Sequence, residues 1–359
     1  MRVVHVTQPV TAGVARVVLD LALAQRDAGW DIAVACPEGW LPDQLRTEGI
    51  EVRPWRATRS PGPGSLLETV RLRALVRDAD LVHLHSSKAG LAGRLATRGR
   101  TPTIFQPHLW SFQVADGPLA RLSKGWEAMA SRWTHQLVCV SDDELAAGRA
   151  AGVSAPAEVV CNGVDTMRLL PVDRTKARQR LGLDDRPTAV CVGRLAPQKG
   201  QDLLLAAWPA VLAEVPDARL VLVGDGPMRT VWSCDHESVV WWGHSDAVAD
   251  FYSAADVVVL PSRAEGMALV PLEAMACGRS VVAFDVAGVR QSVGDAGAVV
   301  AGGDVTALAR ALAARLADPS LASFEGLTGR RRAEALFDRG RMTDQIITLV
   351  EKLVTGGVS

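Results

Sequence analysis

Short apolar runs alternate with longer amphipathic stretches along nearly the whole chain. The apolar runs predict strands at residues 2–7, 31–35, 80–84, 103–106, 137–140, 158–161, 188–193, 219–223, 239–242, 256–260, 280–284 and 298–300. The amphipathic stretches predict helices at residues 14–28, 65–78, 88–98, 201–214, 246–254, 268–277, 304–317 and 341–354. Strands this apolar, separated by crossover helices, are typical of parallel sheets that are covered on both faces. We therefore expect an α/β fold of two Rossmann-like, doubly wound parallel-sheet domains that face a cleft.

The regular pattern lapses between Val164 and Arg186, where irregular and charged sequence separates two similar halves. Each half opens with a strand, a glycine-bearing loop and a helix. A chain of 359 residues has the length of about two domains. We expect an N-terminal domain at residues 1–165, a C-terminal domain at 166–338, and a final helix within 339–359 that crosses back to the first domain.

Basic and acidic residues nearly cancel, with 39 Lys and Arg against 40 Asp and Glu. No overall positive field recruits nucleic acid, so we expect no nucleic-acid partner. Residues 46–100 are locally basic, with eleven Lys and Arg against five Asp and Glu, a difference of +6. This excess favours a solvated face; a surface that meets an anionic membrane or an acceptor is the alternative.

The sequence also predicts a cytoplasmic location. No apolar run approaches the roughly 18 residues needed to span a bilayer, and the first residues lack the long apolar stretch and cleavage site of a signal peptide. The six cysteines, at positions 36, 139, 161, 191, 234 and 277, contain no C-x-x-C pair. They are expected to be small buried hydrophobic residues in a reducing compartment.

The segment from Ala255 to Gly278 carries the strongest chemical signal. It predicts a strand that ends at Pro261, a turn that holds Glu265 and a helix that begins near residue 268. The free N–H groups at such a helix start suit an anion such as a diphosphate. Glu273 follows about five residues into the helix, roughly 8 Å along its axis, which is about the step from a diphosphate to a ribose. Glu265 would then lie on the sugar side of the phosphates.

A second signal is the loop Gly193–Gly200, which follows a predicted strand and contains Arg194 and Lys199. An arginine fork and a lysine point charge at the end of a strand suit a diphosphate. An exposed basic loop with no ligand is about equally common. Because only five lysines occur in the chain, the presence of one here favours a functional role.

Further motifs complete a family pattern. They are Thr11-Ala12-Gly13, Asp80 to Gly90, Pro107-His108-Leu109-Trp110-Ser111-Phe112, Cys161 to Asp165, Val223-Gly224-Asp225-Gly226-Pro227, Gly243-His244 and Ala255-Asp256. Together with Arg194, Lys199 and the pair Glu265 and Glu273, they resemble the GT-B retaining glycosyltransferases of family 4 over residues 2 to 350. The Gly224 turn lacks the third glycine of a dinucleotide fingerprint, so it is expected only to shape the site.

This resemblance implies roles for residues of the C-terminal half. Glu265 would contact the donor sugar beside the reacting carbon, Glu273 would bind the ribose hydroxyls, and Arg194 and Lys199 would neutralise the diphosphate. Backbone groups of Met267, Ala268, Leu269 and Val270 would hold sugar hydroxyls and phosphate, and Gly266 before them is a further donor-binding position. Gly243 and His244 would border the base.

In the N-terminal half the resemblance implies that Gly13 lets the backbone approach the phosphates. It also implies that His108 lies near the donor sugar as a catalytic residue. A lone histidine after a strand is as often a structural residue, and this applies more strongly to His85. Trp110 and His85 are candidates for contact with the acceptor, although tryptophans are usually buried.

The resemblance implies no cofactor and no metal ion, since Arg194 and Lys199 would supply the positive charge. It implies transfer of a sugar from a nucleotide-diphosphate donor to a hydroxyl with retention of configuration. Two departures concern the site: Gly266-Met267-Ala268 replaces the usual Gly-Phe-Gly, and Gln291 replaces the usual glutamate. A sugar phosphorylase, an epimerase and a non-catalytic nucleotide-sugar sensor remain alternatives. The base, the sugar and the acceptor, whether a lipid carrier, a polysaccharide or a small metabolite, stay open.

Overall fold

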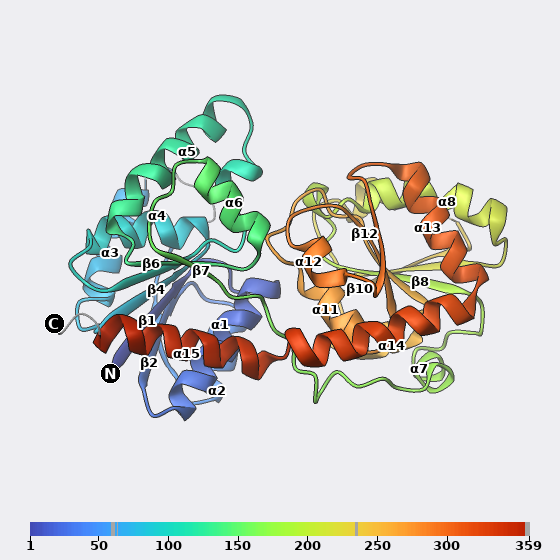
Figure 1. Cartoon of the computed structure of the whole chain (residues 1–359), viewed down its shortest axis with the longest axis horizontal. Helices are drawn as coiled ribbons and strands as arrows, with labels where there is room; N and C mark the ends of the chain where they lie inside the picture. Colours follow the sequence, from blue (N-terminus) through green and yellow to red (C-terminus); the bar gives the residue numbers. More distant parts are fainter. Residues whose placement is uncertain (59–61, 63, 234–235, 356–359) are drawn as a thin grey trace. The chain divides into compact units, whose positions relative to one another are not determined.

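The computed structural model describes residues 1–58, 62, 64–233 and 236–355. The chain divides into two compact units, each with a central sheet covered by helices on both faces (Figure 1). Unit 1 comprises Met1–Asn162 and Arg339–Ser359, and unit 2 comprises Gly163–Asp338. The sequence places the corresponding boundaries after residues 165 and 338.

Unit 1 contains a seven-stranded sheet. Its strands are β1 (Arg2–Thr7), β2 (Asp31–Cys36), β3 (Glu51–Pro54), β4 (Leu81–His85), β5 (Thr103–Gln106), β6 (Gln136–Cys139) and β7 (Ala157–Val159). Its helices are α1 (Ala12–Asp27), α2 (Trp40–Thr47), α3 (Ser65–Leu75), α4 (Ser86–Thr97), α5 (Gly117–Ala130), α6 (Asp142–Ala150) and α15 (Arg339–Thr355), with short 3-10 turns at Ser111–Gln113 and Ser131–Trp133.

Unit 2 contains a six-stranded sheet. Its strands are β8 (Thr188–Val192), β9 (Arg219–Val223), β10 (Val239–Gly243), β11 (Val257–Leu260), β12 (Ser280–Phe284) and β13 (Gly297–Val300). Its helices are α7 (Arg174–Arg180), α8 (Gln201–Glu214), α9 (Arg229–Trp232), α10 (Val248–Ala254), α11 (Leu269–Ala276), α12 (Val289–Val293), α13 (Val305–Ala317) and α14 (Pro319–Leu336), with a 3-10 turn at Pro197–Lys199.

The strand orders are β3-β2-β1-β4-β5-β6-β7 and β10-β9-β8-β11-β12-β13, and the pairs within both sheets are parallel. The predicted fold class, two doubly wound parallel-sheet domains, is therefore confirmed. The order reverses between β1 and β4 in unit 1 and between β8 and β11 in unit 2. Ligands of such sheets bind beyond the carboxyl ends of the strands at these switch points.

Alternation along the strands of unit 1 divides its core into two faces. Val4, Val6, Val82 and Leu84 belong to the apolar cluster that includes residues of α3 and α4. The intervening positions carry the histidines of β1 and β4, and their side chains point to the opposite face. The register aligns His5 with His83, so the sheet itself brings histidines of two strands together.

The last helix belongs to unit 1, where α15 packs against α1 and Arg339 forms an ion pair with Asp20 at 3.3 Å. Figure 1 shows the helix beside α1 and α2. Among the described residues, no helix combines the length and the apolarity that a bilayer span requires. The five described cysteines form no disulfide, and Cys234 lies outside the described residues.

Candidate active site

The loop Gly193–Gly200 connects β8 with α8 at the switch point of unit 2. Its backbone is tied to the neighbouring strand by the Gly193 N–H, which donates to Val223 O at 2.9 Å, and by the Leu195 N–H, which donates to Asp225 O at 3.0 Å. A side chain at Gly224 would collide with the Gly193 carbonyl. The glycine turn after β9 thus fixes the basic loop.

The same loop is also tied to the segment that follows β11. The Arg263 N–H donates to Gln198 O at 2.8 Å, and Gln198 Nε2 donates to Ala264 O at 2.9 Å. Gly200 has a positive φ of 70°, and a Cβ there would overlap the Pro261 carbonyl, so the turn requires glycine. Lys199 is consequently held beside the turn that carries Glu265.

Lys199 and Glu265 are in direct contact. Lys199 Nζ donates to Glu265 Oε1 at 2.6 Å. The Glu265 side chain is 9% exposed, whereas the Lys199 side chain is 26% exposed. The structure therefore brings together two predicted site residues that lie 66 positions apart, and the ammonium group keeps the buried carboxylate paired. Arg194 lies in the same loop with an exposed side chain.

Helix α11 begins directly after this turn. Its N-cap, Ala268, supplies no side-chain hydrogen bond, and the first N–H groups of a helix suit an anion. Leu269 and Val270 form the first two positions of the helix. Met267 and Ala268 are buried, and a Cβ at Gly288 would collide with the Gly266 carbonyl. The Gly266-Met267-Ala268 turn is therefore backed closely by the chain before α12.

Glu273 lies on α11 and is half-buried. The buried Tyr252 hydroxyl donates to Glu273 Oε2 at 2.6 Å. Burial, with a further contribution from Glu273, raises the pKa of Tyr252 well above its usual value, so the hydroxyl stays a donor. Sequence reasoning did not include Tyr252; the signal available was that it is the single tyrosine of the chain, near the helix that carries Glu273.

Gly243 is the last residue of the edge strand β10, and His244 follows it. Gly243 has a φ of 90°, and its carbonyl accepts from the Gly224 N–H at 2.7 Å. The His244 side chain is exposed and lies 3.5 Å from Asp246. These positions are at the carboxyl edge of the sheet, with an exposed Trp242 ring that packs edge-on against Phe251 at 4.8 Å between centroids.

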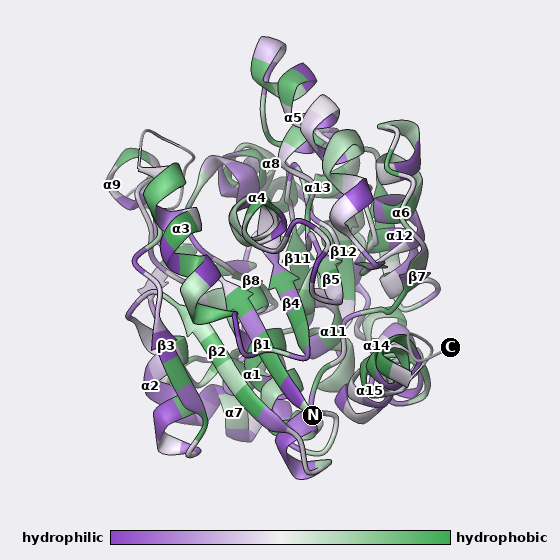
Figure 2. Cartoon of the chain, turned by 90° about the vertical axis from the view of Figure 1, so that its left-hand side faces the viewer, coloured by the Kyte–Doolittle hydropathy of each residue, from purple (hydrophilic) through white to green (hydrophobic). Residues whose placement is uncertain are grey.

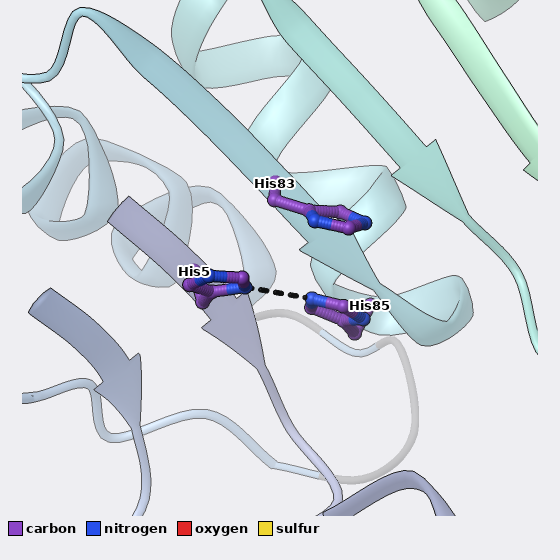
Figure 3. Close-up of side chains that lie close together, drawn as sticks. All are labelled: His5, His83 and His85. Carbon is purple, nitrogen blue, oxygen red and sulfur yellow. Dashed lines mark hydrogen bonds between the residues drawn. The ribbon is translucent and has the colours of Figure 1, made fainter. Parts of the chain in front are cut away.

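In unit 1 the structure joins His85 and His108. His85 is the last residue of β4, and its Nδ1 lies 3.1 Å from Nε2 of His108, which follows β5. On its other side, His85 Nε2 lies 3.0 Å from His5 Nδ1, and His5 Nε2 lies 2.7 Å from Gln25 Oε1 on α1. Figure 3 shows the bond between His5 and His85 and the neighbouring ring of His83. Gln25 and His5 are site-proximal residues that the sequence did not identify.

Burial keeps these histidines neutral. It lowers the pKa of His5 to about 4 and that of His108 to about 3. Burial likewise lowers the pKa of His83 and of His85 well below the usual value. A neutral imidazole has one donor nitrogen and one acceptor nitrogen, so the ring of His108 offers hydrogen bonding rather than positive charge.

Three non-glycine residues with positive φ follow strands of this sheet. They are Ala12 (φ 61°) after β1, Ser86 (φ 74°) after β4 and His108 (φ 60°) after β5. Such conformations cost free energy and tend to occur at functional sites. The value at Ala12 is one that glycine adopts without strain. Gly13 follows in the first turn of α1 and is half-buried.

Trp110 lies in the core. Its side chain is 1% exposed, its ring stacks on Phe112 at 5.4 Å, and its Nε1–H donates to Glu144 O at 2.7 Å. This burial leaves the ring no surface for an acceptor, so the interpretation of Trp110 as an acceptor contact has to be replaced by a packing role. His85 is also fully buried, and its Nδ1 contacts the partly exposed His108.

The three buried histidines at positions 5, 83 and 85 have ligand atoms within 4.8 Å of one another, and they are the group of the described residues that is close enough to hold a metal ion. Their geometry favours another arrangement. His83 and His85 stack with centroids 4.0 Å apart, and the facing nitrogens of His5 and His85 are at hydrogen-bond distance. The nitrogens of His5 and His85 that face one another are thus used in a hydrogen bond.

Gln291 lies on α12 and is half-buried. Its backbone carbonyl accepts from Arg332 Nη2 at 2.6 Å. No carboxylate is therefore offered at this position of unit 2, and the floor of the turn is formed by Met267 and Ala268.

Fold and site together define a two-domain glycosyltransferase of the GT-B type. Residues 186–318 match the family model described as glycosyl transferases group 1, and residues 11–168 match that described as glycosyltransferase family 4. The chain is 31% identical over 310 residues to the GDP-mannose-dependent alpha-(1-6)-phosphatidylinositol monomannoside mannosyltransferase of Mycobacterium tuberculosis, covering 77% of this chain and 78% of that enzyme. The chain belongs to the group 1, family 4 glycosyltransferases.

A second relative carries the same description. It is the enzyme of Mycolicibacterium smegmatis, 38% identical over 203 residues, which cover 51% of this chain and about half, 53%, of that enzyme. Among solved structures, sucrose-phosphate synthase from Thermosynechococcus elongatus superposes with a TM-score of 0.85 at 23% identity, over 99% of this chain and 100% of that one. At this identity the likeness concerns the fold.

Proposed function

We propose that this glycosyltransferase moves a sugar from a nucleotide-diphosphate sugar to an acceptor hydroxyl, with retention of the anomeric configuration and without a metal ion. The observation that carries the proposal is the contact of Lys199 with Glu265 beside the uncapped start of α11. A cation, a buried carboxylate and a helix start are thereby offered at one switch point. The relatives named above as GDP-mannose-dependent support a nucleotide sugar as the donor.

The proposed chemistry requires charge stabilisation. As the bond between sugar and diphosphate breaks, negative charge grows on the leaving group, and Arg194 and Lys199 neutralise it. The sugar becomes oxocarbenium-like, with Glu265 beside it. The acceptor hydroxyl attacks from the face that the diphosphate leaves, and a departing phosphate oxygen takes its proton. Glu273, oriented by Tyr252, binds the ribose hydroxyls, and Gly243 and His244 border the base.

We assign the acceptor to unit 1, where His108 offers a ring nitrogen to a substrate hydroxyl. The bond from His85 engages Nε2 of His108, which leaves Nδ1 as the ring nitrogen for a ligand. Because burial lowers the pKa of His108 to about 3, the ring acts as a neutral hydrogen-bond partner. His108 thus positions a hydroxyl and does not deliver a positive charge.

The first test is a thermal-shift screen with UDP, GDP, ADP and their sugars on the wild-type chain and on Lys199→Ala. A ligand that binds only the folded state adds about 2.7 kcal/mol of stability at 100 times its dissociation constant. We expect one nucleoside diphosphate to raise the melting temperature of the wild type and to act much more weakly on Lys199→Ala. No shift with any nucleotide would contradict the proposal. Repetition with EDTA tests the absence of a metal requirement.

Product analysis separates the alternatives. A transferase releases nucleoside diphosphate in the presence of acceptor, a phosphorylase requires free phosphate, and an epimerase changes the sugar without release. Donor binding without turnover across a wide acceptor panel would instead favour the sensor. Proton NMR of the new glycosidic bond would give its anomeric configuration and hence test retention.

For the acceptor we propose a lipid at an anionic membrane surface. The basic excess of residues 46–100 is compatible with a surface that meets such a membrane. Helix α3 lies in this segment and exposes Leu66 (75%) and Val70 (68%), close to the exposed Arg71 and Arg73. Figure 2 shows α3 among the helices of unit 1, coloured by hydropathy. Exposed apolar side chains with adjacent arginines suit the surface of anionic lipids, and the relatives named above act on phosphatidylinositol mannosides by their description.

Co-sedimentation with vesicles tests this assignment. We expect binding to phosphatidylcholine vesicles that contain phosphatidylinositol, and a loss of binding in the double variant Leu66→Gln and Val70→Gln. Leu327→Gln changes an equally exposed leucine on α14 of unit 2 and serves as the matched control. Equal sedimentation of wild type and double variant would assign α3 to a solvated face.

A further inference from the structure

Four side chains of unit 1 form a continuous line of hydrogen-bonded groups. It runs from Gln25 on α1 through His5 on β1 and His85 on β4 to His108 after β5, with separations of 2.7, 3.0 and 3.1 Å. Gln25, His5 and His85 are at most 1% exposed, and only His108 is partly accessible. The line therefore joins a buried amide to a histidine at the carboxyl edge of the sheet.

The direction of each hydrogen bond in this line follows from the orientation of the Gln25 amide at its inner end. Gln25 presents its carbonyl oxygen to His5, and an amide oxygen only accepts, so His5 Nε2 carries the proton. A neutral His5 then accepts at Nδ1, and this requires a proton on His85 Nε2. By the same step His85 accepts at Nδ1, and the proton of His108 lies on Nε2. The outer nitrogen of His108, Nδ1, is left as an acceptor.

Packing holds the rings in the orientation that this line needs. His83 stacks on His85 with centroids 4.0 Å apart and an interplanar angle of 30°. His85 and His108 are nearly parallel, at 23°. Ser86 and His108 adopt positive φ at the same edge, which indicates that the surrounding structure imposes their positions. A positive φ costs free energy at a residue other than glycine, so a purely packing role for His108 would not favour this conformation.

We infer that Gln25, His5 and His85 are positioning residues that fix His108 in the tautomer protonated at Nε2, so that its Nδ1 accepts a hydrogen bond from a substrate hydroxyl. The inference rests on the proposed function, because it assigns the ligand of His108 to a substrate. The reversed amide orientation of Gln25 would invert every bond and place a proton on His108 Nδ1. A donor nitrogen would then face the substrate, so the two arrangements predict different chemistry.

Nitrogen-15 NMR of the full-length chain, labelled at histidine, measures the tautomer directly. The His108 signals are assigned by their absence in His108→Asn. We expect Nε2 of His108 to carry the proton in the wild type. Gln25→Met, which lacks the accepting oxygen, should give a mixture of tautomers, whereas Gln25→Glu should retain the wild-type form because its carboxylate also accepts. Gln136→Met makes the same chemical change at another buried position of unit 1 and should leave His108 unaltered.

Kinetics with the nucleotide sugar give a second readout. We expect Gln25→Met to lower kcat/KM by about tenfold with unchanged affinity for the nucleoside diphosphate, and Gln25→Glu to restore most of it. A wild-type His108 protonated at Nδ1, or an unchanged tautomer in Gln25→Met, would overturn the inference. A tautomer shift in Gln25→Met without a change in kcat/KM would contradict the part of the inference that places a substrate hydroxyl at His108 Nδ1. Absence of any sugar transfer by the wild type would refute the proposed function, while the NMR result would still decide the tautomer.

Discussion

Lys199 Nζ lies 2.6 Å from Glu265 Oε1, and the carboxylate is the more deeply buried partner. The basic loop after β8 and the turn after β11 are thus linked by an ion pair. The Lys199 ammonium group is the polar partner of this buried carboxylate. A diphosphate that binds beside the start of α11 would share the ammonium group with Glu265, which couples donor binding to the position of this carboxylate.

Lys199→Ala should therefore lose much of its turnover. Removal of one group that stabilises transition-state charge costs about 3 kcal/mol, which corresponds to roughly a hundredfold in rate. Steady-state kinetics with the donor found in the thermal-shift screen measure this. Lys176→Ala removes an exposed lysine of unit 2 and should keep the wild-type rate. A Lys199→Ala rate within a factor of three of the wild type would contradict the diphosphate role.

Glu273→Ala should chiefly weaken nucleotide binding. A hydrogen bond to a charged group is worth about 1.5–3 kcal/mol, so the dissociation constant should rise roughly tenfold to a hundredfold. Tyr252→Phe removes only the donor that orients the carboxylate and should act in the same direction with a smaller effect. Calorimetric titration with the nucleoside diphosphate measures both. Glu214→Ala, at an exposed position, is the control, and unchanged affinity in Glu273→Ala would exclude the ribose contact.

Acid should destabilise unit 1 through its buried histidines. The folded pKa is lowered to about 4 for His5 and to about 3 for His108, against 6.5 in the unfolded chain. The unfolded state therefore binds more protons below pH 6.5, and stability falls as the pH falls, by about 1.4 kcal/mol per pH unit for each such histidine. Urea denaturation at pH 7 and pH 5, carried out on Glu144→Gln so that the opposing titration of Glu144 is removed, measures the loss. His244→Asn, at an exposed histidine, should leave the difference unchanged, and equal stability at both pH values would refute neutral burial.

Glu144 should show the opposite dependence. Its side chain is fully buried, and burial, opposed by the Val140 N–H, raises the pKa from 4.5 to about 8. Because the pKa of Glu144 is higher in the folded state, its protonation contributes to the free energy of unfolding. This contribution is fully present below the unfolded pKa of 4.5 and is lost as the pH rises toward 8, at about 1.4 kcal/mol per pH unit. Glu144→Gln removes this titration and should melt at a higher temperature than the wild type at pH 8, with a smaller gain at pH 5. Glu158→Gln, at an exposed position, should show no pH-dependent difference, and the same result for Glu144→Gln would contradict the shift.

Several elements could not be predicted from periodicity. Helix α14 carries Gly326 and Gly329 in its interior, residues that weaken a helical pattern. A Cβ at Gly326 would collide with the Gly278 carbonyl, so these residues permit close packing on α11. Helix α5 exposes Leu119 and Leu122, which blurs its amphipathic face. In both segments the local pattern does not predict a helix, and the contacts with other elements decide the structure.

The sequence by itself determined the two parallel sheets and the segment from β11 to α11. Apolar runs of strand length require cover on both faces, and Glu265, the start of α11 and Glu273 are neighbours in one continuous strand, turn and helix, so local spacing sets their order. Tertiary structure alone decided which distant residues meet. The contacts of Lys199 with Glu265, of Tyr252 with Glu273 and of Gln25, His5, His85 and His108 follow from strand order and register, and the burial of Trp110 follows from the packing of helices on the sheet. Local sequence carries no information on these because each depends on side chains that only the folded sheet brings together.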